Sequence, residues 1–367
     1  MNGHQKGRGA VSNHAGRFAR QTAEPAIDDW AEELDALPKL ATVVRDEAAK
    51  SIISRNASPD VPFEQSINPY RGCEHGCVYC FARPTHSYLD LSPGLDFETQ
   101  LYYKKNAAEL LQAELRKPGY VCKPITIGAS TDPYQPIERE HRITRQLLDT
   151  LLEYRHPVSL VTKGSLIERD LDLLSELARL ELVTVHVSVT SLDERLKRNL
   201  EPRAASAGAR LRTIERLSSA GVPVGALIAP VIPALTDHEL ESIVERVASA
   251  GATTADYVLL RLPHEVASLF VEWLETHYPD RAAHVMSLVR QSRGGKDYDA
   301  TWGQRMRGTG RFADLIDKRF ELACRKAGLL RRVDKTLRTD RFTVPKRTGD
   351  QLTLGGAGLG LEEHASR

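Results

Sequence analysis

Residues 66–80 read SINPYRGCEHGCVYC, a short strand-forming run that leads directly into three cysteines. Similar runs recur along the chain, and each is followed by a stretch with the apolar spacing of an amphipathic helix. This alternation predicts βα units around a parallel sheet, and therefore an α/β fold. The expected strands are Ser66–Tyr70, Ile125–Ala129, Val158–Thr162, Val183–Val189, Val222–Ile228 and Tyr257–Arg261. The expected helices are Tyr102–Arg116, Glu138–Tyr154, Arg169–Arg179, Gly208–Ala220, Asp237–Ala250 and His264–His277, with a further helical stretch at Leu192–Leu200.

Six βα units are two fewer than a full (β/α)8 barrel needs, so we expect a partial (β/α)6 barrel or an open curved sheet. In such folds the chemistry gathers at the carboxyl ends of the strands. The residues at the ends of the expected strands and just past them are polar or unusual, as an enzyme requires: Cys73, Ser130, Thr131, Asp132, Lys163, Ser188, Thr190, Pro230, Pro233 and Arg261.

The chain divides into four expected parts. Residues 1–60 are rich in Gly, Arg, Asn, Ala and Asp and predict an irregular N-terminal arm. For this arm a solvated tail is favoured over a segment that embraces the domain or a nucleic acid. The partial barrel is expected over 61–280, a basic and mostly helical C-terminal extension over 281–347, and a flexible tail over 348–367.

Composition excludes several classes of protein. The 367 residues carry 50 Lys and Arg against 49 Asp and Glu, and their ordinary apolar share excludes bulk disorder. There is no run of about 18 apolar residues, and residues 1–20 are polar and basic, so we expect no membrane span, no secretory signal and a cytoplasmic protein. The five cysteines are an odd number and three of them are crowded together, which favours reduced thiols that bind metal over a disulfide framework.

The near-neutral total conceals a basic segment. Residues 290–347 hold 17 Lys and Arg against 7 Asp and Glu. Such a segment is able to contact phosphates, so a nucleic-acid substrate is one hypothesis, and solvated helix faces are the alternative. Within it, Arg305–Arg311 mixes glycine with arginine but lacks the strand context of a phosphate-binding loop, and we expect it to be a lid over the mouth of the barrel.

The strongest motif is the C-x3-C-x2-C cluster of Cys73, Cys77 and Cys80. Gly72 and Gly76 allow the backbone to fold around a compact centre. Thiolates in such a loop bind soft or borderline metals. In a [4Fe-4S] cube, three cysteine ligands leave one iron open to an exchangeable ligand.

A structural zinc site is the alternative interpretation of this motif. Zinc also accepts three cysteines and one histidine at short spacings, and His75 or His86 would complete the set. The protein would then be a non-catalytic module that binds nucleic acid or protein. Zinc ribbons usually bring their ligands as two separated pairs, which a single triplet at the start of a βα array does not match.

The cysteine spacing, with Tyr79 just before the third cysteine and a strand just before the motif, resembles the signature of the radical S-adenosylmethionine (radical SAM) enzymes. The resemblance implies a [4Fe-4S] cluster whose open iron is chelated by the amino and carboxylate groups of SAM. It also implies that an electron from the reduced cluster cleaves SAM to a 5′-deoxyadenosyl radical, which abstracts hydrogen from the substrate. An electron donor such as flavodoxin or ferredoxin is then an expected partner.

In more detail the chain is similar to the spore photoproduct lyase-related branch of that family, and to a widespread bacterial subgroup of it. The similarity runs from about Pro62 to Pro345 and rests on the stretches Asn68–Cys73, Thr131–Pro136, Thr162–Lys163, Arg169–Asp170, Glu201–Arg203 and Pro230–Pro233. The resemblance implies that Thr131, Lys163 and Ser188 contact SAM. Hydroxyls suit its ribose and methionyl groups, and an ammonium suits its carboxylate. The alternatives are that the Lys163 side chain is solvated, and that the Ser188 hydroxyl forms hydrogen bonds only with backbone groups.

One position departs from the branch. Photoproduct lyases carry a hydrogen-donating cysteine three places before the residue that is Asp132 here, and this chain has Ala129 instead. The departure argues against thymine-dimer lyase activity by the same route. Cys122 is near in sequence but at the wrong end of its strand, and Cys324 is expected to be a buried helix thiol.

Two arginines are candidate contacts for an anionic group, because a planar guanidinium chelates carboxylate or phosphate. They are Arg203 and Arg261, and for both a structural salt bridge with Glu201 or Asp132 is the equally weighted alternative. Asp132 is alternatively a cap of the loop that follows it. The sequence assigns no catalytic residue beyond the cofactor ligands.

Overall fold

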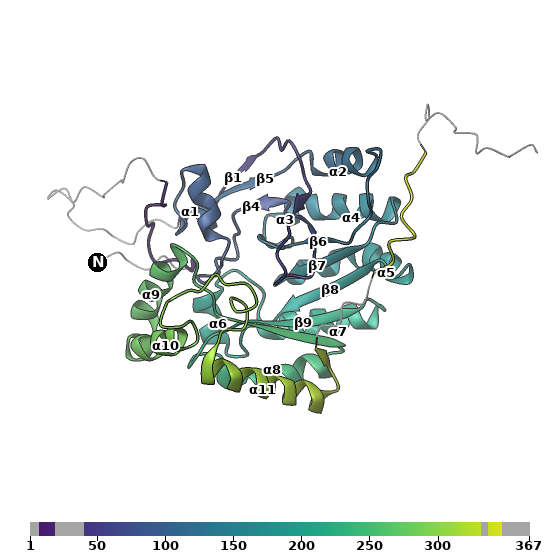
Figure 1. Ribbon diagram of the computed structural model, residues 1–367. Helices are drawn as coiled ribbons and strands as arrows, with labels where there is room; N and C mark the ends of the chain where they lie inside the picture. The colour runs from purple at the N-terminus through teal and green to yellow at the C-terminus, as the bar shows by residue number, and fades with distance from the viewer. Residues whose placement is uncertain (1–6, 19–39, 332–336, 347–367) are drawn as a thin grey trace, which may run out of the picture.

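The computed structural model describes residues 7–18, 40–331 and 337–346, and an eight-stranded sheet lies at its centre (Figure 1). Six neighbouring strands run parallel: β3 (Gln65–Ile67), β6 (Ile125–Ile127), β7 (Val158–Thr162), β8 (Val183–Ser188), β9 (Val224–Val231) and β10 (Thr254–Leu259). At one edge β2 (Ser54–Arg55) pairs antiparallel with β3, and at the other β11 (Leu330–Arg331) pairs parallel with β10. Over the described ranges these two edges do not pair with each other, so the sheet is open. The predicted partial barrel of six βα units is confirmed.

Helices follow the strands, and most of them cover the outer side of the curved sheet, whereas the helices over 194–200 and 266–277 pack together at the cysteine loop (Figure 1). Those of the βα units are α2 (Ala107–Leu115), α3 (Glu138–His141), α4 (Ile143–Glu153), α5 (Leu171–Arg179), α6 (Glu194–Leu200), α7 (Ala207–Ser219), α8 (Leu240–Ser249) and α9 (Val266–His277). Short 3-10 turns lie at Arg83–Leu89, Ser165–Asp170 and Asp237–Glu239, and α1 is the single turn Asp96–Thr99. The expected helix Glu138–Tyr154 is divided into α3 and α4, because Arg142 adopts a left-handed conformation with φ of 52°.

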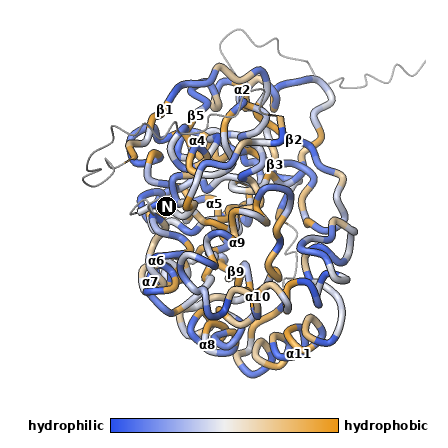
Figure 2. Tube along the Cα trace, turned by 90° about the vertical axis from the view of Figure 1, so that its left-hand side faces the viewer, coloured by the Kyte–Doolittle hydropathy of each residue, from blue (hydrophilic) through white to orange (hydrophobic). Residues whose placement is uncertain are grey.

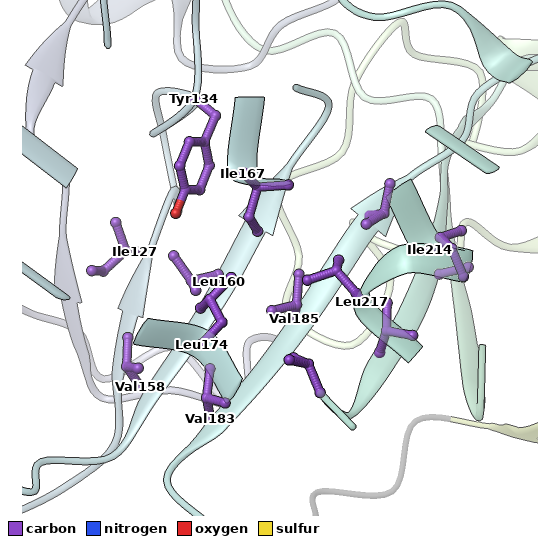
Figure 3. Close-up of a cluster of buried hydrophobic side chains, with 14 of the residues drawn as sticks. Ile127, Tyr134, Val158, Leu160, Ile167, Leu174, Val183, Val185, Ile214 and Leu217 are labelled. Carbon is purple, nitrogen blue, oxygen red and sulfur yellow. The ribbon is translucent and has the colours of Figure 1, made fainter. Parts of the chain in front are cut away.

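The main core lies between the strands and these helices. In Figure 3, Leu160 of β7 and Val185 of β8 point at the same layer as Leu174 of α5 and Leu217 of α7. All four side chains are fully buried. Burial of this kind supplies most of the stability of short amphipathic helices, which are marginal in isolation.

A second, small sheet corrects two sequence predictions. It contains β1 (Val43–Asp46), β5 (Gln100–Tyr103) and β4 (Tyr70–Arg71) in the order β1-β5-β4. The residues Tyr102 and Tyr103, which we expected to begin a helix, therefore belong to a strand, and the helix starts only at Ala107. The expected first strand is also divided after Ile67, because Pro69 has no amide hydrogen for a sheet ladder.

The N-terminal arm is not the solvated tail that we favoured, as far as it is described. Residues 40–60 contribute β1 and β2 to the two sheets. Residues 8–11 are buried against the domain, and Ala10 has no exposed surface at all. We call the described residues 7–18 the N-terminal strap. The arm embraces the domain, which was the less favoured alternative.

The C-terminal extension forms two helices and a strand, of which the second helix and the strand pack onto the sheet and the first helix packs against α9. Its helices are α10 (Pro279–Gln291), which begins just before the expected boundary, and α11 (Gly310–Ala327). α11 lies beside α8 at the same end of the molecule in both views (Figures 1 and 2) and buries Phe320 against Tyr257 of β10. The expected tail 348–367 lies outside the described residues. In the described part of the chain, no helix combines the length and the apolar character that crossing a membrane requires.

Candidate functional site

The three cysteines lie in one loop at the carboxyl end of β3. Cys73 and Cys77 are buried, Cys80 is partly buried, and all three are free thiols. Tight turns close the loop, in which the amide of Cys80 donates to the carbonyl oxygen of Cys77 at 3.2 Å. Gly72 has a φ of 74°, and a methyl group at its Cα would lie 2.8 Å from the carbonyl oxygen of Phe97. This position of the loop therefore requires glycine.

The donor set fits an iron–sulfur cluster. Burial raises the pKa of all three thiols, to about 12 for Cys77, and the neighbouring Cys77 and Cys80 contribute to the increase at Cys73. Three thiolates in this protein environment are therefore unfavourable by themselves, and the positive charge of bound iron would compensate them. In the described residues, no three Cys, His, Asp or Glu side chains are arranged as ligands of a single ion.

The two histidines considered as zinc ligands have other partners. Nδ1 of His75 lies 3.3 Å from a carboxylate oxygen of Asp132, and both side chains are largely buried. Nε2 of His86 lies 2.9 Å from the carbonyl oxygen of Gln100. Both rings thus tie the cysteine loop to its surroundings.

A buried acid network supports the loop from the side of β8 and α7. The carboxylate of Glu201 has no exposed surface and accepts the hydroxyl of Thr190 at 2.7 Å, the hydroxyl of Tyr79, and a guanidinium N–H of Arg210. Burial by itself would raise the pKa of Glu201, but Arg210 and Lys163 prevail and hold it at about 2. The network therefore fixes the aromatic residue that precedes the third cysteine.

The backbone of the same segment continues this support. The amide of Val78 donates to the carbonyl oxygen of Leu200 at 3.1 Å, and the amide of Arg203 donates to the carbonyl oxygen of His75 at 3.2 Å. Neither expected partner of Arg203 is correct, because its guanidinium pairs with Glu74 at 2.8 Å. We had not singled out Glu74 or Arg210, since their neighbours in sequence carry no pattern that points to this contact.

The N-terminal strap supports the loop from the opposite side. The carboxylate of the fully buried Glu98 accepts the amides of Gly9 at 2.9 Å and Ala10 at 2.8 Å, and pairs with the fully buried Arg83 at 2.5 Å. A methyl group at the Cα of Gly9 would lie 1.7 Å from the carbonyl oxygen of Gly76, so the strap lies directly on the cysteine loop. No sequence signal finds this contact, because the strap has no periodic structure.

The expected SAM contacts lie at one edge of the sheet. Thr131 follows β6, Lys163 follows β7, and Ser188 ends β8. Thr131 and Ser188 are buried, whereas Lys163 is partly exposed. The hydroxyl of Thr131 donates to the carbonyl oxygen of Tyr70 at 3.0 Å, which leaves its oxygen lone pairs as acceptors. The structure therefore brings together three residues that are distant in sequence, at the edge that carries the cysteine loop.

Asp132 organises this edge, in agreement with the capping alternative. Its carboxylate accepts the amide of Tyr134 at 2.9 Å, the hydroxyl of Thr162 at 2.7 Å and the amide of Lys163 at 2.6 Å. Burial alone would raise its pKa, but these donors and His75 hold it at about 2. Asp132 thus joins the ends of β6 and β7 to the cysteine loop as an anion.

The ammonium of Lys163 lies 5.9 Å from the centre of the Tyr79 ring, at the cysteine loop. It lowers the pKa of Cys77, Cys80 and Glu201, although other groups dominate those shifts. Over the described ranges it has no carboxylate within salt-bridge distance. A partly exposed cation without an acidic partner is available to an anionic ligand.

The remaining cysteines lie where the sequence indicated. Cys122 precedes β6 at its amino end, and Cys324 is buried within α11. Ala129 stands two residues past the end of β6, so no thiol occupies the position of the hydrogen donor of photoproduct lyases. Apart from the three cysteines of the loop, no cysteine of the described residues lies at that edge.

The basic C-terminal segment is largely paired with acids. Eight of its described arginines form ion pairs, several of them with acids outside the segment: Arg290, Arg305, Arg307, Arg319, Arg325, Arg331, Arg338 and Arg341. Paired guanidinium groups on a protein surface contribute little to a phosphate-binding field. The structure therefore does not favour this segment as a nucleic-acid surface.

The expected lid segment, Arg305–Arg311, lies beside the end of β10. The amide of Leu259 donates to the carbonyl oxygen of Met306 at 2.9 Å, and Arg307 pairs with Asp256. Arg305 pairs with Asp60, which joins the segment to residues near the first strand. These contacts place it at the edge of the barrel mouth, while a closing motion stays a prediction.

An open parallel βα sheet with three free thiols in a loop at its carboxyl edge is the architecture of enzymes that begin radical chemistry at an iron–sulfur cluster. A model of the radical SAM superfamily matches residues 67–247. An uncharacterized protein of Mycobacterium tuberculosis is 38% identical over 233 residues, covering 63% of this chain and 68% of the relative. The chain belongs to the radical SAM superfamily and is an enzyme of that type. This membership contradicts the alternative of a non-catalytic zinc module.

More distant relatives come from an archaeon and a phage. An uncharacterized protein of Methanocaldococcus jannaschii is 27% identical over 214 residues, 58% of this chain and 76% of the relative. A protein of Pseudomonas phage M6 named radical SAM Nalpha-GlyT isomerase is 23% identical over 238 residues, 64% of this chain and 48% of the relative.

Solved structures of spore photoproduct lyase share the fold. The complex with dinucleoside spore photoproduct superposes with a TM-score of 0.56 at 14% identity, covering 78% of this chain and 80% of the lyase. A double mutant of the lyase with bound AdoMet and the same dinucleoside gives a TM-score of 0.55 at 16% identity, covering 74% of this chain and 77% of the lyase. The fold is consistent with the branch that the sequence resembles. The family implies a [4Fe-4S] cluster, SAM and a reductant.

Proposed function

We propose that Cys73, Cys77 and Cys80 hold a [4Fe-4S] cluster, and that the enzyme cleaves SAM reductively to act on a nucleic acid or a nucleotide. The observation that carries the proposal is the group of three free thiols in one loop, two of them buried and one partly buried, beside the partly exposed cation Lys163. When bound by these three residues, the cluster would supply one electron for the reductive cleavage of SAM to methionine and a 5′-deoxyadenosyl radical, which is the chemistry of the family.

The residues around the loop would bind and orient SAM. The ammonium of Lys163 would pair with the SAM carboxylate, because it lies at the loop and has no acidic partner among the described residues. Thr131 and Ser188 present hydroxyl groups at the ends of neighbouring strands, where they would accept or donate hydrogen bonds to the ribose and methionyl groups. These three residues remain our proposed SAM contacts.

The substrate class is supported by relatives rather than by a surface of this protein. The related fold includes a lyase solved with a dinucleoside photoproduct, and a phage relative is named for a GlyT isomerase. Ala129 offers no thiol hydrogen, so we propose no photoproduct lyase activity by the thiol route. Flavodoxin or ferredoxin is the proposed electron donor, and the cytoplasm is the proposed compartment.

The test is an anaerobic EPR spectrum of the reconstituted, dithionite-reduced protein, recorded with and without SAM and combined with an assay for 5′-deoxyadenosine. We expect a reduced-cluster signal that shifts when SAM is added, and formation of 5′-deoxyadenosine. Both should be lost in Cys77→Ala and retained in Cys122→Ala, whose thiol lies at the far end of β6. Stoichiometric zinc, with no cluster and no SAM cleavage after reconstitution, would contradict the proposal.

A further inference from the structure

Arg261 is a cation with no acidic partner in the ranges 7–18, 40–331 and 337–346. It lies two residues past the end of β10 and is partly buried. Its Nη1 donates to the sulfur of Met306 at 3.0 Å, which is a weak acceptor. Its neighbours Arg305 and Arg307, by contrast, pair with Asp60 and Asp256. A guanidinium held in a partly buried place without an anion is a costly arrangement unless a ligand completes it.

The guanidinium faces the cysteine loop through an aromatic ring. Its carbon lies 4.6 Å from the centre of the Phe81 ring, and Phe81 directly follows Cys80. The ring is 45% exposed, so part of it is open to solvent.

The C-terminal extension holds Arg261 in place. Arg293, which is 1% exposed, donates to the carbonyl oxygens of Leu259 at 3.1 Å and Leu260 at 2.8 Å, the two residues before Arg261. It also donates to Gln304 at 3.0 Å. The backbone on which Arg261 stands is therefore fixed before any ligand arrives, as a preorganised binding group requires.

Two cations flank the cysteine loop on different sides. Lys163 follows β7 and lies over Tyr79, whereas Arg261 follows β10 and lies over Phe81. The proposed SAM molecule carries one carboxylate, for which Lys163 is the assigned partner. Arg261 is then left for a second anion.

We propose that Arg261 and the exposed part of the Phe81 ring form a substrate subsite that takes a nucleotide, free or within a strand, with the phosphate on the guanidinium and the base against the ring. The inference rests on the proposed function and names its substrate group. A guanidinium binds phosphate through two parallel hydrogen bonds, which an ammonium does not reproduce. Aromatic side chains stack on bases of any sequence.

The test is anaerobic equilibrium dialysis of the reconstituted holoenzyme against each deoxynucleoside 5′-monophosphate, each nucleoside, and a ten-residue single-stranded DNA. We expect at least one monophosphate to bind about ten- to a hundredfold more tightly than its nucleoside, as charge-assisted hydrogen bonds imply. Arg261→Gln should abolish this preference, and Arg261→Lys should restore only part of it. Arg290→Gln is the matched control, since it removes the same charge from an exposed pair with Asp297, and it should retain the preference.

Binding of the DNA strand but of no monophosphate, weakened in Arg261→Gln, would support the subsite and assign it to a phosphate within a strand. No preference for phosphate in the wild-type protein, together with no binding of the strand, would overturn the proposal. A preference for phosphate that persists in Arg261→Gln would also overturn the proposal. This holds even if the variant changes the EPR signal of the cluster. Formation of 5′-deoxyadenosine, measured in the same preparations, reports separately on the proposed function.

Discussion

The cysteine loop has two surroundings that treat charge in opposite ways. On its supporting sides, every buried charge that we describe has its partner: Glu98 pairs with Arg83, and Glu201 pairs with Arg210. On the side of the strand ends, Lys163 and Arg261 point at the loop without an acid in the described part of the chain.

The difference separates residues that stabilise the cysteine loop from residues that are free to bind a ligand. A buried ion pair whose hydrogen bonds are all made gains nothing from a ligand, whereas an unpaired cation in a partly buried place gains a great deal. The supporting pairs should therefore determine stability, and the unpaired cations should determine affinity. The following four experiments would break or sharpen this distinction.

The largest loss in the free energy of unfolding is expected for Glu98→Ala. The substitution leaves Arg83 buried without a counter-charge and removes the acceptor for the amides of Gly9 and Ala10. Breaking a buried pair in this way costs about 3–5 kcal/mol. Urea denaturation of the apo-protein measures the loss, and hydrogen exchange at Gly9 and Ala10 should become fast.

The control for this prediction is Asp46→Asn, which removes an exposed partner of Lys105. We expect the denaturation midpoint of this variant to equal that of the wild-type protein. A midpoint in Glu98→Ala that also equals the wild-type value would show that the supporting pair does not hold the loop.

The second largest loss in the free energy of unfolding is expected for Glu201→Gln, and this loss should depend on pH. The pKa of Glu201 is about 2 in the fold against an ordinary value of 4.5. A lowered pKa in the folded state means that the ionised carboxylate stabilises the fold above pH 4.5, and that this contribution disappears as the pH falls through 2. The shift corresponds to about 3 kcal/mol.

Denaturation curves of the wild-type and Glu201→Gln proteins at pH 7, 4.5 and 3 measure this difference. The gap in the free energy of unfolding should be largest at pH 7 and narrow steadily toward acid. A gap of constant size would mean that the pair with Arg210 does not carry the effect.

A smaller effect is expected for Gly9→Ala. The new methyl group would lie 1.7 Å from the carbonyl oxygen of Gly76, so the strap has to move away from the cysteine loop. Overpacking of this kind costs about 1–3 kcal/mol. The iron content that remains after a fixed exposure of the reconstituted protein to air should fall together with the stability.

Gly208→Ala is the matched control, because the new methyl group would meet no heavy atom closer than 3.6 Å. Gly208 lies inside α7, where alanine is favoured by about 1 kcal/mol. Equal retention of iron in both variants would argue against a role of the strap at the loop.

The smallest effect on stability is expected for Lys163→Gln. Lys163 forms no ion pair in the described residues and acts on Glu201 only at longer range, so its loss should lower the free energy of unfolding by at most about 1 kcal/mol. Its affinity for SAM, measured by equilibrium dialysis of the holoenzyme, should nevertheless fall by about ten- to a hundredfold. A large loss of stability with unchanged affinity would place Lys163 among the supporting residues.

The sequence predicts the parts of this fold that repeat. The six parallel strands from β3 to β10 were predicted, because each is a short apolar run followed by a helical period, whereas the two-residue strand β11 was not. Strand order placed Thr131, Lys163 and Ser188 among the polar residues of the carboxyl edge, since parallel strands end at the same edge, and the family resemblance singled them out as SAM contacts.

The parts that could not be predicted are contacts between segments without a period. Pro69 divides a run that otherwise resembles one strand, and the aromatic pair at Tyr102 and Tyr103 extends into a second sheet. The contact of Glu98 with Gly9 joins residues 89 positions apart. Nothing in the local sequence of either residue indicates such a partner, because the donors are backbone amides, which every residue except proline has, and only the accepting carboxylate is a side chain.

The N-terminal strap also sets an order of events during synthesis. Gly9 and Ala10 leave the ribosome well before Glu98, and Ser12 bonds Glu272, which is 260 residues further along the chain. The part of the strap at Ser12 can therefore dock only after α9 has been made, whereas the cysteine loop is complete much earlier. Until α9 has been made, the cover of the loop is incomplete.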